Sequence, residues 1–475
     1  MARVSIGKIS LPHAGSPAPP GRAAWDAGDL PGDSGANRRC RSMGRMTDTG
    51  RIRVAIACQG GGSHTAFTAG VLERLLGAEE LAGVEVVGLS GTSGGAVCAL
   101  LAWSALLDDD PAAAGELLEA FWADNSATSP LEQLVNAWVM WAAKLEGLVV
   151  LPAVSPYDTW TSTSALEEFR AMLERRVDFG RLAAPAGDAA PMLLVGAVDV
   201  LSGEFKAFNS RHDKITADTI LASAAIPTLF RAVHVDGGTY WDGLFSQNPP
   251  VRELVDTRPD ELWVIQINPR RWDGEPRTMV EIADRRNELS GNLSLHQELG
   301  FIEKIDQLLE EGRLVADGRY KQIVVRLIEL TRPRRSRSLG TGSKLNRDPA
   351  FIRELLDHGQ ARAEEFLAAL AFEGAWRRRD PEAVLGCFAG DAELTSTPPF
   401  PDRGTLRGRR QLRQFVRQHL TTDLHVDPTR QQVARDRVTW AVRAYRDDPG
   451  RLATHPGRAE AAFRDGRITS LRLGG

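Results

Sequence analysis

The chain has 475 residues, of which 43% are hydrophobic and 25% charged, and these ordinary globular proportions exclude disorder throughout. Its four cysteines contain no C-x-x-C pair, which excludes a disulfide framework and a thiolate zinc site and favours a reducing, cytoplasmic location; they are Cys40, Cys58, Cys98 and Cys387. The net charge of −4 gives no case for nucleic-acid binding.

The small net charge hides an asymmetry along the chain. Residues 1–50 carry a net +3, residues 371–475 hold 19 Arg, no Lys and 13 acidic residues for a net +6, and the part between carries −13. An acidic body with a basic tail indicates two different units. The first 50 residues are rich in Gly, Pro, Ala and Ser and are predicted to be a disordered leader. No segment reaches the roughly 18 uncharged apolar residues of a membrane span.

From residue 52 onward, strand patterns alternate with helix patterns. Strands are predicted at 54–58, 84–89, 192–200, 261–267 and 322–327, and helices at 66–76, from about residue 96, over much of 99–173, and from 348 to about 371. This alternation predicts parallel βαβ units of the α/β class, with helices covering the sheet. Past residue 372, one or two helices and then several strands from about 423 to 473 predict a separate α+β domain. The predicted domains are therefore 51–371 and 372–475.

The second glycine-rich turn, Gly91-Thr92-Ser93-Gly94-Gly95, is a G-x-S-x-G between a predicted strand and a predicted helix. Such a turn holds the serine in strained backbone geometry and exposes its hydroxyl at a helix N-terminus, where developing negative charge is favoured. Ser93 is therefore the candidate nucleophile.

The first glycine-rich turn, Gly60-Gly61-Gly62, directly follows the first strand. Three glycines allow the backbone to present its N–H groups to an oxyanion or a phosphate. A dinucleotide fingerprint would need Gly where Thr65 stands, and no P-loop Lys follows. Beside a serine turn on the next strand, an oxyanion hole is the simplest interpretation.

A nucleophilic serine needs a base. Four histidines follow Ser93 in the same body: His212, His234, His296 and His358. None lies in a recognisable loop motif, and a histidine of this kind is more often a surface or core residue. The alternative is a carboxylate that accepts the serine proton directly.

Four motifs occur in a fixed order: the Gly60–Gly62 triplet, the Ser93 turn, Ala222-Ser223-Ala224-Ala225-Ile226-Pro227, and Asp242-Gly243 leading to Asn248-Pro249-Pro250. Together they resemble the patatin-like phospholipase family over roughly residues 52–370. The resemblance implies a patatin-like parallel-sheet sandwich covered by helices and hydrolysis of lipid acyl esters through a Ser-Asp dyad and an acyl-enzyme. It places the nucleophile at Ser93, the base at Asp242 and the oxyanion donors at Gly60, Gly61 and Gly62, with no metal or organic cofactor.

Asp236-Gly237-Gly238 competes with Asp242, because it is the closer match to the family's Asp-Gly-Gly. The interval to Asn248 favours Asp242. The sequence departs from the family twice: Ser63-His64 stands where a basic residue usually follows the glycine triplet, and Leu244 replaces the second glycine after Asp242. His64 would restore the missing positive charge only if protonated.

The expected partner is a lipid or other acyl ester. Five of the eleven tryptophans lie in the helical stretch after Ser93: Trp103, Trp122, Trp138, Trp141 and Trp160. They are consistent with a cap over an acyl chain, with an ordinary helical core, or with a surface for peripheral membrane contact. A second class of function, a ligand-binding or scaffolding protein on the same fold, also fits the altered loop after Gly62. The sequence sets no oligomeric state.

The tail resembles the SnoaL-like branch of the NTF2-like fold, an α+β cone. The motifs are Trp376 with Arg379-Asp380-Pro381, Phe388 to Ala392, Pro398-Pro399, the Gly404 to Arg409 turn, and Asp465 to Ile468. Asp391, His419 and His425 are candidate pocket residues, although a structural role is the commoner one for each. The arginine excess favours a solvated face over an anion-attracting surface.

Overall fold

The computed structural model describes residues 50–145, 154–158, 161–182, 187, 189–272, 274–316, 320–331, 339–398, 404–421, 424–434, 437–446 and 455–474. The predicted leader, apart from its last residue, lies outside these ranges.

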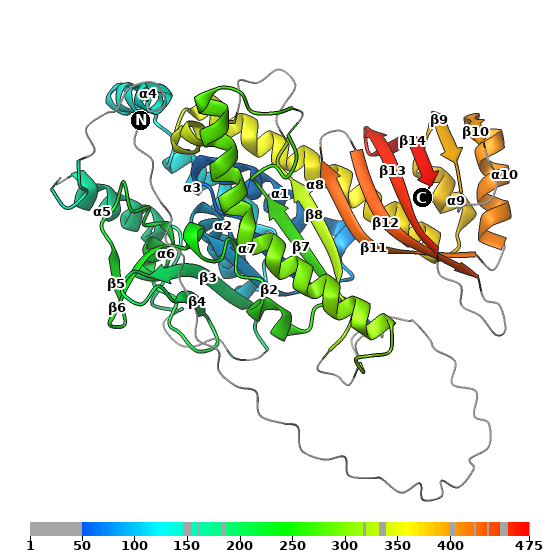
Figure 1. Ribbon diagram of the computed structural model, residues 1–475, viewed down its shortest axis with the longest axis horizontal. Helices are drawn as coiled ribbons and strands as arrows, with labels where there is room; N and C mark the ends of the chain where they lie inside the picture. Colours follow the sequence, from blue (N-terminus) through cyan, green and yellow to red (C-terminus); the bar gives the residue numbers. More distant parts are fainter. Residues whose placement is uncertain are drawn as a thin grey trace, which may run out of the picture. The chain divides into compact units, whose positions relative to one another are not determined.

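Five parallel strands form the centre of the sheet: β1 (Ile52–Cys58), β2 (Val84–Thr92), β3 (Met192–Asp199), β7 (Glu261–Gln266) and β8 (Val324–Glu329). They lie in the order β8-β7-β1-β2-β3 (Figure 1). Short antiparallel strands β4 (Phe205–Asn209), β6 (Gly238–Asp242) and β5 (Val233–Val235) continue the sheet beyond β3. All five parallel strands were predicted, which confirms the α/β class. The three short strands have too few residues to show a clear period of two.

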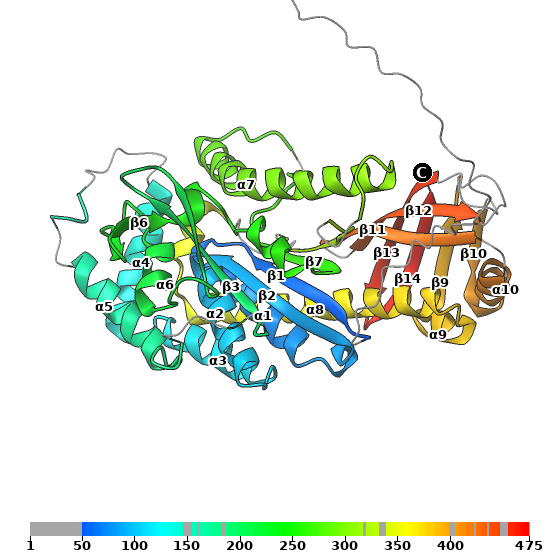
Figure 2. The same cartoon turned by 90° about the horizontal axis from the view of Figure 1, so that it is seen from below.

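Helices cover both faces of this sheet (Figures 1 and 2). On one face lie α1 (Ala66–Leu76), α2 (Gly94–Leu107), α3 (Ala113–Asp124) and α8 (Pro349–Arg377), and on the other lies α7 (Met279–Glu310). Alternate residues of β1 serve the two faces, because strand side chains point to opposite sides. Ile56 belongs to the larger core with α1, α2 and α8, whereas Ala57 packs in a second core with Leu295 of α7.

The predicted helical stretch after Ser93 divides into α2, α3, α4 (Pro130–Leu145) and α5 (Thr161–Glu174), and α6 (Ala217–Ala224) follows β4. No sequence pattern predicted α7. Its buried face includes Asp284, Glu288 and Asn292, spaced four residues apart. Polar residues on the buried side remove the apolar period by which an amphipathic helix is recognised.

The tail contains α9 (Pro381–Gly386), β9 (Phe388–Ser396), β10 (Gly404–Arg407), α10 (Gly408–Thr421), β11 (Leu424–Ala434), β12 (Arg437–Arg446), β13 (His455–Arg464) and β14 (Arg467–Gly474). It is α+β, as predicted, but β9 and β10 precede α10. This order differs from the prediction, in which the helices precede all the strands. Gly390 and Asp391 look like turn residues in sequence, yet they lie within β9.

The tail strands continue the sheet of the body. β11 pairs in parallel with β8, and the complete order is β10-β9-β14-β13-β12-β11-β8-β7-β1-β2-β3-β6-β5, with β4 on β3. At this joint the fully buried Arg326 donates hydrogen bonds of 2.7–2.9 Å to Glu261, Glu373 and Gln431. The predicted domain boundary at 371/372 falls inside α8 and stays a prediction. The patatin-like sandwich of the body and the cone shape of the tail also stay predictions.

Candidate active site

The first glycine-rich turn is packed against other parts of the chain so closely that side chains are excluded. A Cβ on Gly60 would lie 2.2 Å from the Thr92 carbonyl oxygen, and a Cβ on Gly62 would lie 2.2 Å from the carbonyl oxygen of Lys344. Gly62 also has a φ of 58°, a conformation that favours glycine. The glycines therefore allow this turn to approach both the Ser93 turn and a distant segment.

The three glycine amides are not equivalent. The Gly60 N–H donates to Asn248 Oδ1 at 2.7 Å, so it already has an acceptor. In the part of the chain that the structure describes, the N–H groups of Gly61 and Gly62 have no protein acceptor. Of the three predicted oxyanion donors, Gly61 and Gly62 are therefore the two available to a ligand.

Ser93 stands between β2 and α2, at the N-cap of the helix. Its backbone has φ 56° and ψ −132°, the strained geometry that the motif predicted, and its side chain is buried. The Ser93 N–H donates to Ser223 Oγ at 2.9 Å. A Cβ on Gly60 would lie 3.0 Å from the Ser93 Cβ, so the two glycine-rich turns meet here.

Asp242 ends β6, where it pairs with Ala197 of β3. The Ser93 side chain lies close enough to the carboxylate to lower its pKa, and the Leu244 N–H donates to Oδ1 at 2.8 Å. Asp242 is buried, and this burial raises its pKa to about 7 against the lowering effects of these two groups and of Lys344. The competing Asp236 lies in the exposed turn between β5 and β6, with φ 47°.

Two further motif residues hold Ser93 and Asp242 in place. Ser223, on α6, accepts from Ser93 and donates its own hydroxyl to the Gly196 carbonyl at 2.6 Å. The Asp242 N–H donates to the Ala225 carbonyl at 3.0 Å. One short segment thus hydrogen-bonds to the backbones of both Ser93 and Asp242.

The structure adds a residue that no motif predicted. Lys344 lies in η5 (Thr341–Leu345), far from the glycine triplet in sequence, and its partly buried Nζ donates to Asn268 Oδ1 at 2.9 Å and to Asn287 Oδ1 at 2.8 Å. Burial lowers its pKa to about 8, and its charge acts on Asp242. A lone lysine in a polar segment carries no sequence signal, so only the folded chain identifies it.

The His64 ring holds the same segment in place. It belongs to η1 (Gly62–Thr65), and its Nε2 lies 2.7 Å from Ser343 Oγ. The Ser343 hydroxyl donates its single proton to the Gly340 carbonyl at 2.7 Å, so the imidazole is the donor in the His64–Ser343 bond. His64 therefore connects the glycine turn to η5.

The tryptophans after Ser93 serve two different purposes. Trp103 and Trp122 are buried in the core, whereas Trp138 and Trp141 on α4 are 64% and 58% exposed. Trp160 lies outside the described residues. α4 is joined to the neighbourhood of η5, because Asn136 donates to Asn346 Oδ1 at 3.0 Å.

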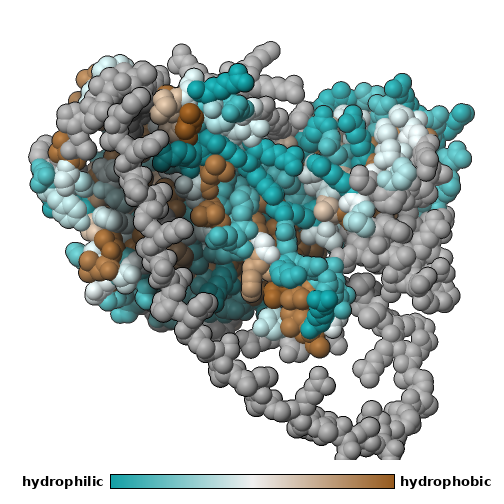
Figure 3. All heavy atoms as spheres, viewed as in Figure 1, coloured by the Kyte–Doolittle hydropathy of each residue, from teal (hydrophilic) through white to brown (hydrophobic). Residues whose placement is uncertain are grey.

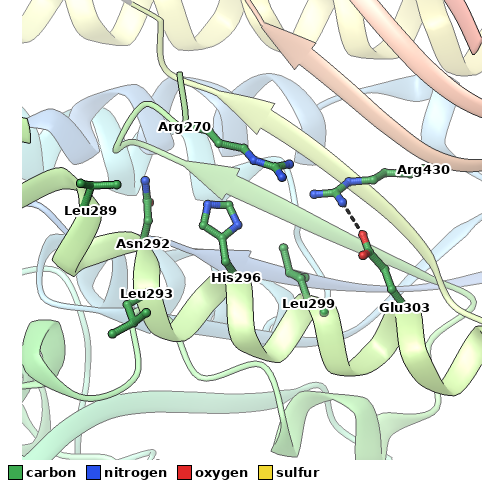
Figure 4. A pocket seen from close by; sticks show the side chains of 9 residues that line it. Arg270, Leu289, Asn292, Leu293, His296, Leu299, Glu303 and Arg430 are labelled. Atoms are coloured by element: carbon green, nitrogen blue, oxygen red, sulfur yellow. Dashed lines mark hydrogen bonds and ion pairs between the residues drawn. The ribbon is translucent and has the colours of Figure 1, made fainter. Parts of the chain in front are cut away.

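A hollow of about 300 Å³ lies between α7 and β11, and its lining includes neither Ser93 nor Asp242. Figure 4 shows the side chains of Arg270 and Arg430 pointing toward the same space above His296, with Glu303 paired to Arg430. Burial and the two arginines lower the pKa of His296. The face of the molecule in Figure 3, seen as in Figure 1, is mainly hydrophilic with separate hydrophobic patches among its coloured residues. His296 is thus placed away from Ser93.

The tail encloses its own small apolar cavity of about 60 Å³. His419, a predicted pocket residue, lines it together with Trp376 and Trp440. Asp391 does not line it and instead forms an exposed ion pair with Arg464 at 3.1 Å. The side chain of His425 lies outside the described part.

Among the described residues, neither a membrane-spanning helix nor a metal-binding group is present. No helix among them is long and apolar enough to cross a bilayer. No three of their His, Cys, Asp or Glu side chains gather in a group that could hold a metal ion.

Comparison with known proteins gives two family matches. Residues 56–255 match the model of the patatin-like phospholipases, and residues 368–471 match that of the SnoaL-like domain. The first match includes Gly60 to Gly62, Ser93 and Asp242, and ends before Lys344. A search of curated proteins found no match.

Similar solved structures correspond to about a quarter of the chain. An NTF2-like protein from Mesorhizobium loti is 23% identical, covering 23% of this chain and 89% of its own, with a TM-score of 0.21. An NTF2-like protein from Burkholderia xenovorans is 20% identical, covering 23% and 87%, with a TM-score of 0.21. A protein with a ketosteroid isomerase-like fold from Catenulispora acidiphila is 22% identical, covering 23% and 84%, with a TM-score of 0.20.

The two family matches agree with the two resemblances drawn from the sequence motifs. The chain carries a patatin-like phospholipase domain followed by a SnoaL-like domain.

Proposed function

We propose that the protein is a serine acyl hydrolase that cleaves acyl esters of lipids, with Ser93 as the nucleophile and Asp242 as the base. The observation that carries the proposal is the juxtaposition of Ser93, at a strained turn on the N-terminus of α2, with the buried Asp242. The same short segment, through Ser223 and Ala225, hydrogen-bonds to the backbones of both, and the Ser93 side chain lowers the pKa of Asp242. The match to the patatin-like phospholipases supports the lipid class of substrate.

In the first half of the reaction, Ser93 Oγ attacks the ester carbonyl carbon and its proton passes to Asp242. The N–H groups of Gly61 and Gly62 bind the resulting oxyanion, and the N-terminus of α2 adds a favourable dipole. The tetrahedral intermediate then collapses. The alcohol leaves with the proton from Asp242, and the acyl group stays on Ser93.

In the second half, Asp242 accepts a proton from water, and the hydroxide attacks the acyl-enzyme carbonyl. Collapse of this second intermediate releases the carboxylic acid and returns the proton to Ser93. A base works best when its pKa lies near the working pH. The pKa of about 7 that burial produces in Asp242 meets this requirement.

α4 supports a lipid surface as the place of action. Five apolar side chains at helical spacing are each at least 53% exposed: Leu131, Leu134, Val135, Trp138 and Trp141. An exposed apolar face with two tryptophans is typical of helices that lie in a membrane interface. We include peripheral contact with the substrate surface, through α4, in the proposed function.

The test combines active-site labelling with an ester screen. A fluorophosphonate is expected to label wild-type protein at Ser93, and acyl esters of graded chain length, including phospholipids, are expected to be hydrolysed. Ser93→Ala and Asp242→Asn are expected to lose activity by about 10³-fold or more. Asp236→Asn is the matched control, because it changes the competing aspartate in an exposed turn. Labelling at another residue, or loss of activity in Asp236→Asn with retention in Asp242→Asn, would refute the proposal.

A further inference from the structure

We infer that Lys344 is the fixed cation of this site, and that its ammonium group replaces the basic residue that the sequence lacks after the glycine triplet. The inference rests on the proposed Ser93–Asp242 function. It assigns an electrostatic role to a residue that lies outside the matched patatin-like region.

Lys344 lies directly against the glycine turn. A Cβ built on Gly61 would lie 3.7 Å from the Lys344 Cε, and a Cβ built on Gly62 would lie only 2.2 Å from the Lys344 carbonyl oxygen. These are the two residues whose amides are available to an oxyanion. η5 and η1 pack together, and the His64–Ser343 hydrogen bond of 2.7 Å fixes the residue immediately before Lys344.

The Lys344 amine is partly buried and is hydrogen-bonded without being neutralised by its direct partners. Both of its hydrogen-bond acceptors, Asn268 Oδ1 and Asn287 Oδ1, are uncharged. Asn268 is connected to the turn itself, since its N–H donates to Gln59 Oε1 at 2.9 Å and Gln59 directly precedes Gly60. The ammonium is therefore positioned by the same network that positions the glycine turn.

The charges that act on the Lys344 amine come from carboxylates. Three carboxylates favour its charged form: Asp242 at the end of β6, and Asp284 and Glu288 on α7. The last two have other partners, because Asp284 Oδ1 accepts from the Thr341 N–H at 2.7 Å and Glu288 pairs with Arg285 at 3.2 Å.

Two other titratable groups near η5, His64 and Glu132, have partners other than Lys344. His64 of η1 donates to Ser343, and Glu132 of α4 lies 3.8 Å from Arg347. Asp242 is thus the acid beside Lys344 that the proposed reaction uses.

The chemistry explains why one cation here would serve both stages of attack. Before attack, the negative charge is on Asp242. When the Ser93 proton moves to Asp242, the negative charge moves to the oxyanion at Gly61 and Gly62. Lys344 lies against those glycines and its charge acts on Asp242, so a positive charge stays near the negative charge throughout the transfer.

The experiment is a set of pH–rate profiles on a soluble short-chain aryl ester for wild type, Lys344→Met, Lys344→Gln and Lys344→Arg. Glutamine keeps hydrogen-bond donors for Asn268 and Asn287 without the charge, and arginine keeps the charge. We expect kcat/KM to fall at least tenfold in the Met and Gln variants and less in the Arg variant. The wild-type profile should rise near pH 7 and fall above about pH 8, as Asp242 and then Lys344 lose their protons.

In the Met and Gln variants the acid limb should move to higher pH, because the charge that lowers the Asp242 pKa is gone, and the alkaline limb near pH 8 should vanish. Lys321→Met is the matched control. It removes a lysine paired with Asp260 at 2.7 Å, and its profile should equal that of wild type. Thermal melting of every variant checks folding.

A Lys344→Gln profile identical to wild type would overturn the inference. So would an acid limb that stays at the wild-type pH in both the Met and the Gln variant, because the charge at residue 344 would then not act on Asp242. The proposed function fails separately: it is wrong if Ser93→Ala stays active. Loss of activity in Ser93→Ala and Asp242→Asn with normal Lys344 variants would remove only the role of Lys344.

Discussion

Ser223→Ala is the sharpest test of how Ser93, the proposed nucleophile, is held. The substitution removes the Oγ that accepts the Ser93 N–H at 2.9 Å and that donates to the Gly196 carbonyl at 2.6 Å. Leaving a buried N–H without an acceptor costs about 1–3 kcal/mol. If this loss is expressed in the positioning of Ser93, kcat/KM falls by about 5- to 150-fold. The free energy of unfolding should fall by about 1–3 kcal/mol as well.

Ser210→Ala separates the two effects. Ser210 is equally buried, and its Oγ accepts the Leu193 N–H at 2.9 Å, so its loss leaves a comparable backbone donor unpaired on β3. Urea unfolding should show similar destabilisation in both variants, whereas kcat/KM and the rate of fluorophosphonate labelling should fall only in Ser223→Ala. Equal activity in the two variants would refute the reasoning, because it would mean that the Ser93 N–H does not need this acceptor.

Three further predictions concern charge, the joint and the lipid surface. Asp242→Asn should become more stable relative to wild type as pH rises from about 4 to 7. Burial raises the pKa of Asp242 in the folded protein to about 7, so the wild type loses stability over that window. Urea unfolding at pH 5 and pH 8 measures this, and a difference in unfolding free energy between the two proteins that does not change with pH contradicts it. Arg326→Met should lower the unfolding free energy by about 3–5 kcal/mol, since it removes the buried arginine that pairs with the two buried carboxylates Glu261 and Glu373. Arg353→Met, at an exposed pair, should cost at most about 1 kcal/mol, and similar losses would show that the joint is not a buried ion network. Replacing Trp138 and Trp141 by Glu should reduce sedimentation with phospholipid vesicles and hydrolysis of vesicle lipid while leaving hydrolysis of a soluble ester unchanged; unchanged vesicle binding would exclude α4 as the contact.

Local sequence was enough to predict much of the fold and the candidate residues. A G-x-S-x-G after a buried strand determines a tight strand-to-helix turn, because nearly all of its constraints lie within a few residues, and Ser93 has the strained backbone expected of such a turn. The interval from Asp242 to Asn248 likewise favoured Asp242 over Asp236, and this choice stays a prediction. Asn248 binds the Gly60 N–H, so this spacing reflects a real contact. The catalytic roles of these residues stay predictions.

Other features depend on contacts between residues far apart in the chain, and periodicity cannot encode them. α7 escaped prediction because its buried face carries Asp284, Glu288 and Asn292, which are partnered only in the folded protein. Where β8 pairs with β11, Arg326 meets two carboxylates and one amide from three separate segments, Glu261, Glu373 and Gln431.

Composition and motif order by themselves determined an acidic α/β body with a serine turn, a glycine turn and an aspartate, followed by a basic α+β tail. Only the tertiary structure decided which glycine amides have acceptors and which cation lies beside them. Hydrogen bonding to Asn248 occupies Gly60, and the folding of η5 onto the turn brings Lys344 to Gly61 and Gly62. The interaction energy of two charges grows as the distance between them shortens and as water is excluded, and both depend on how the chain packs.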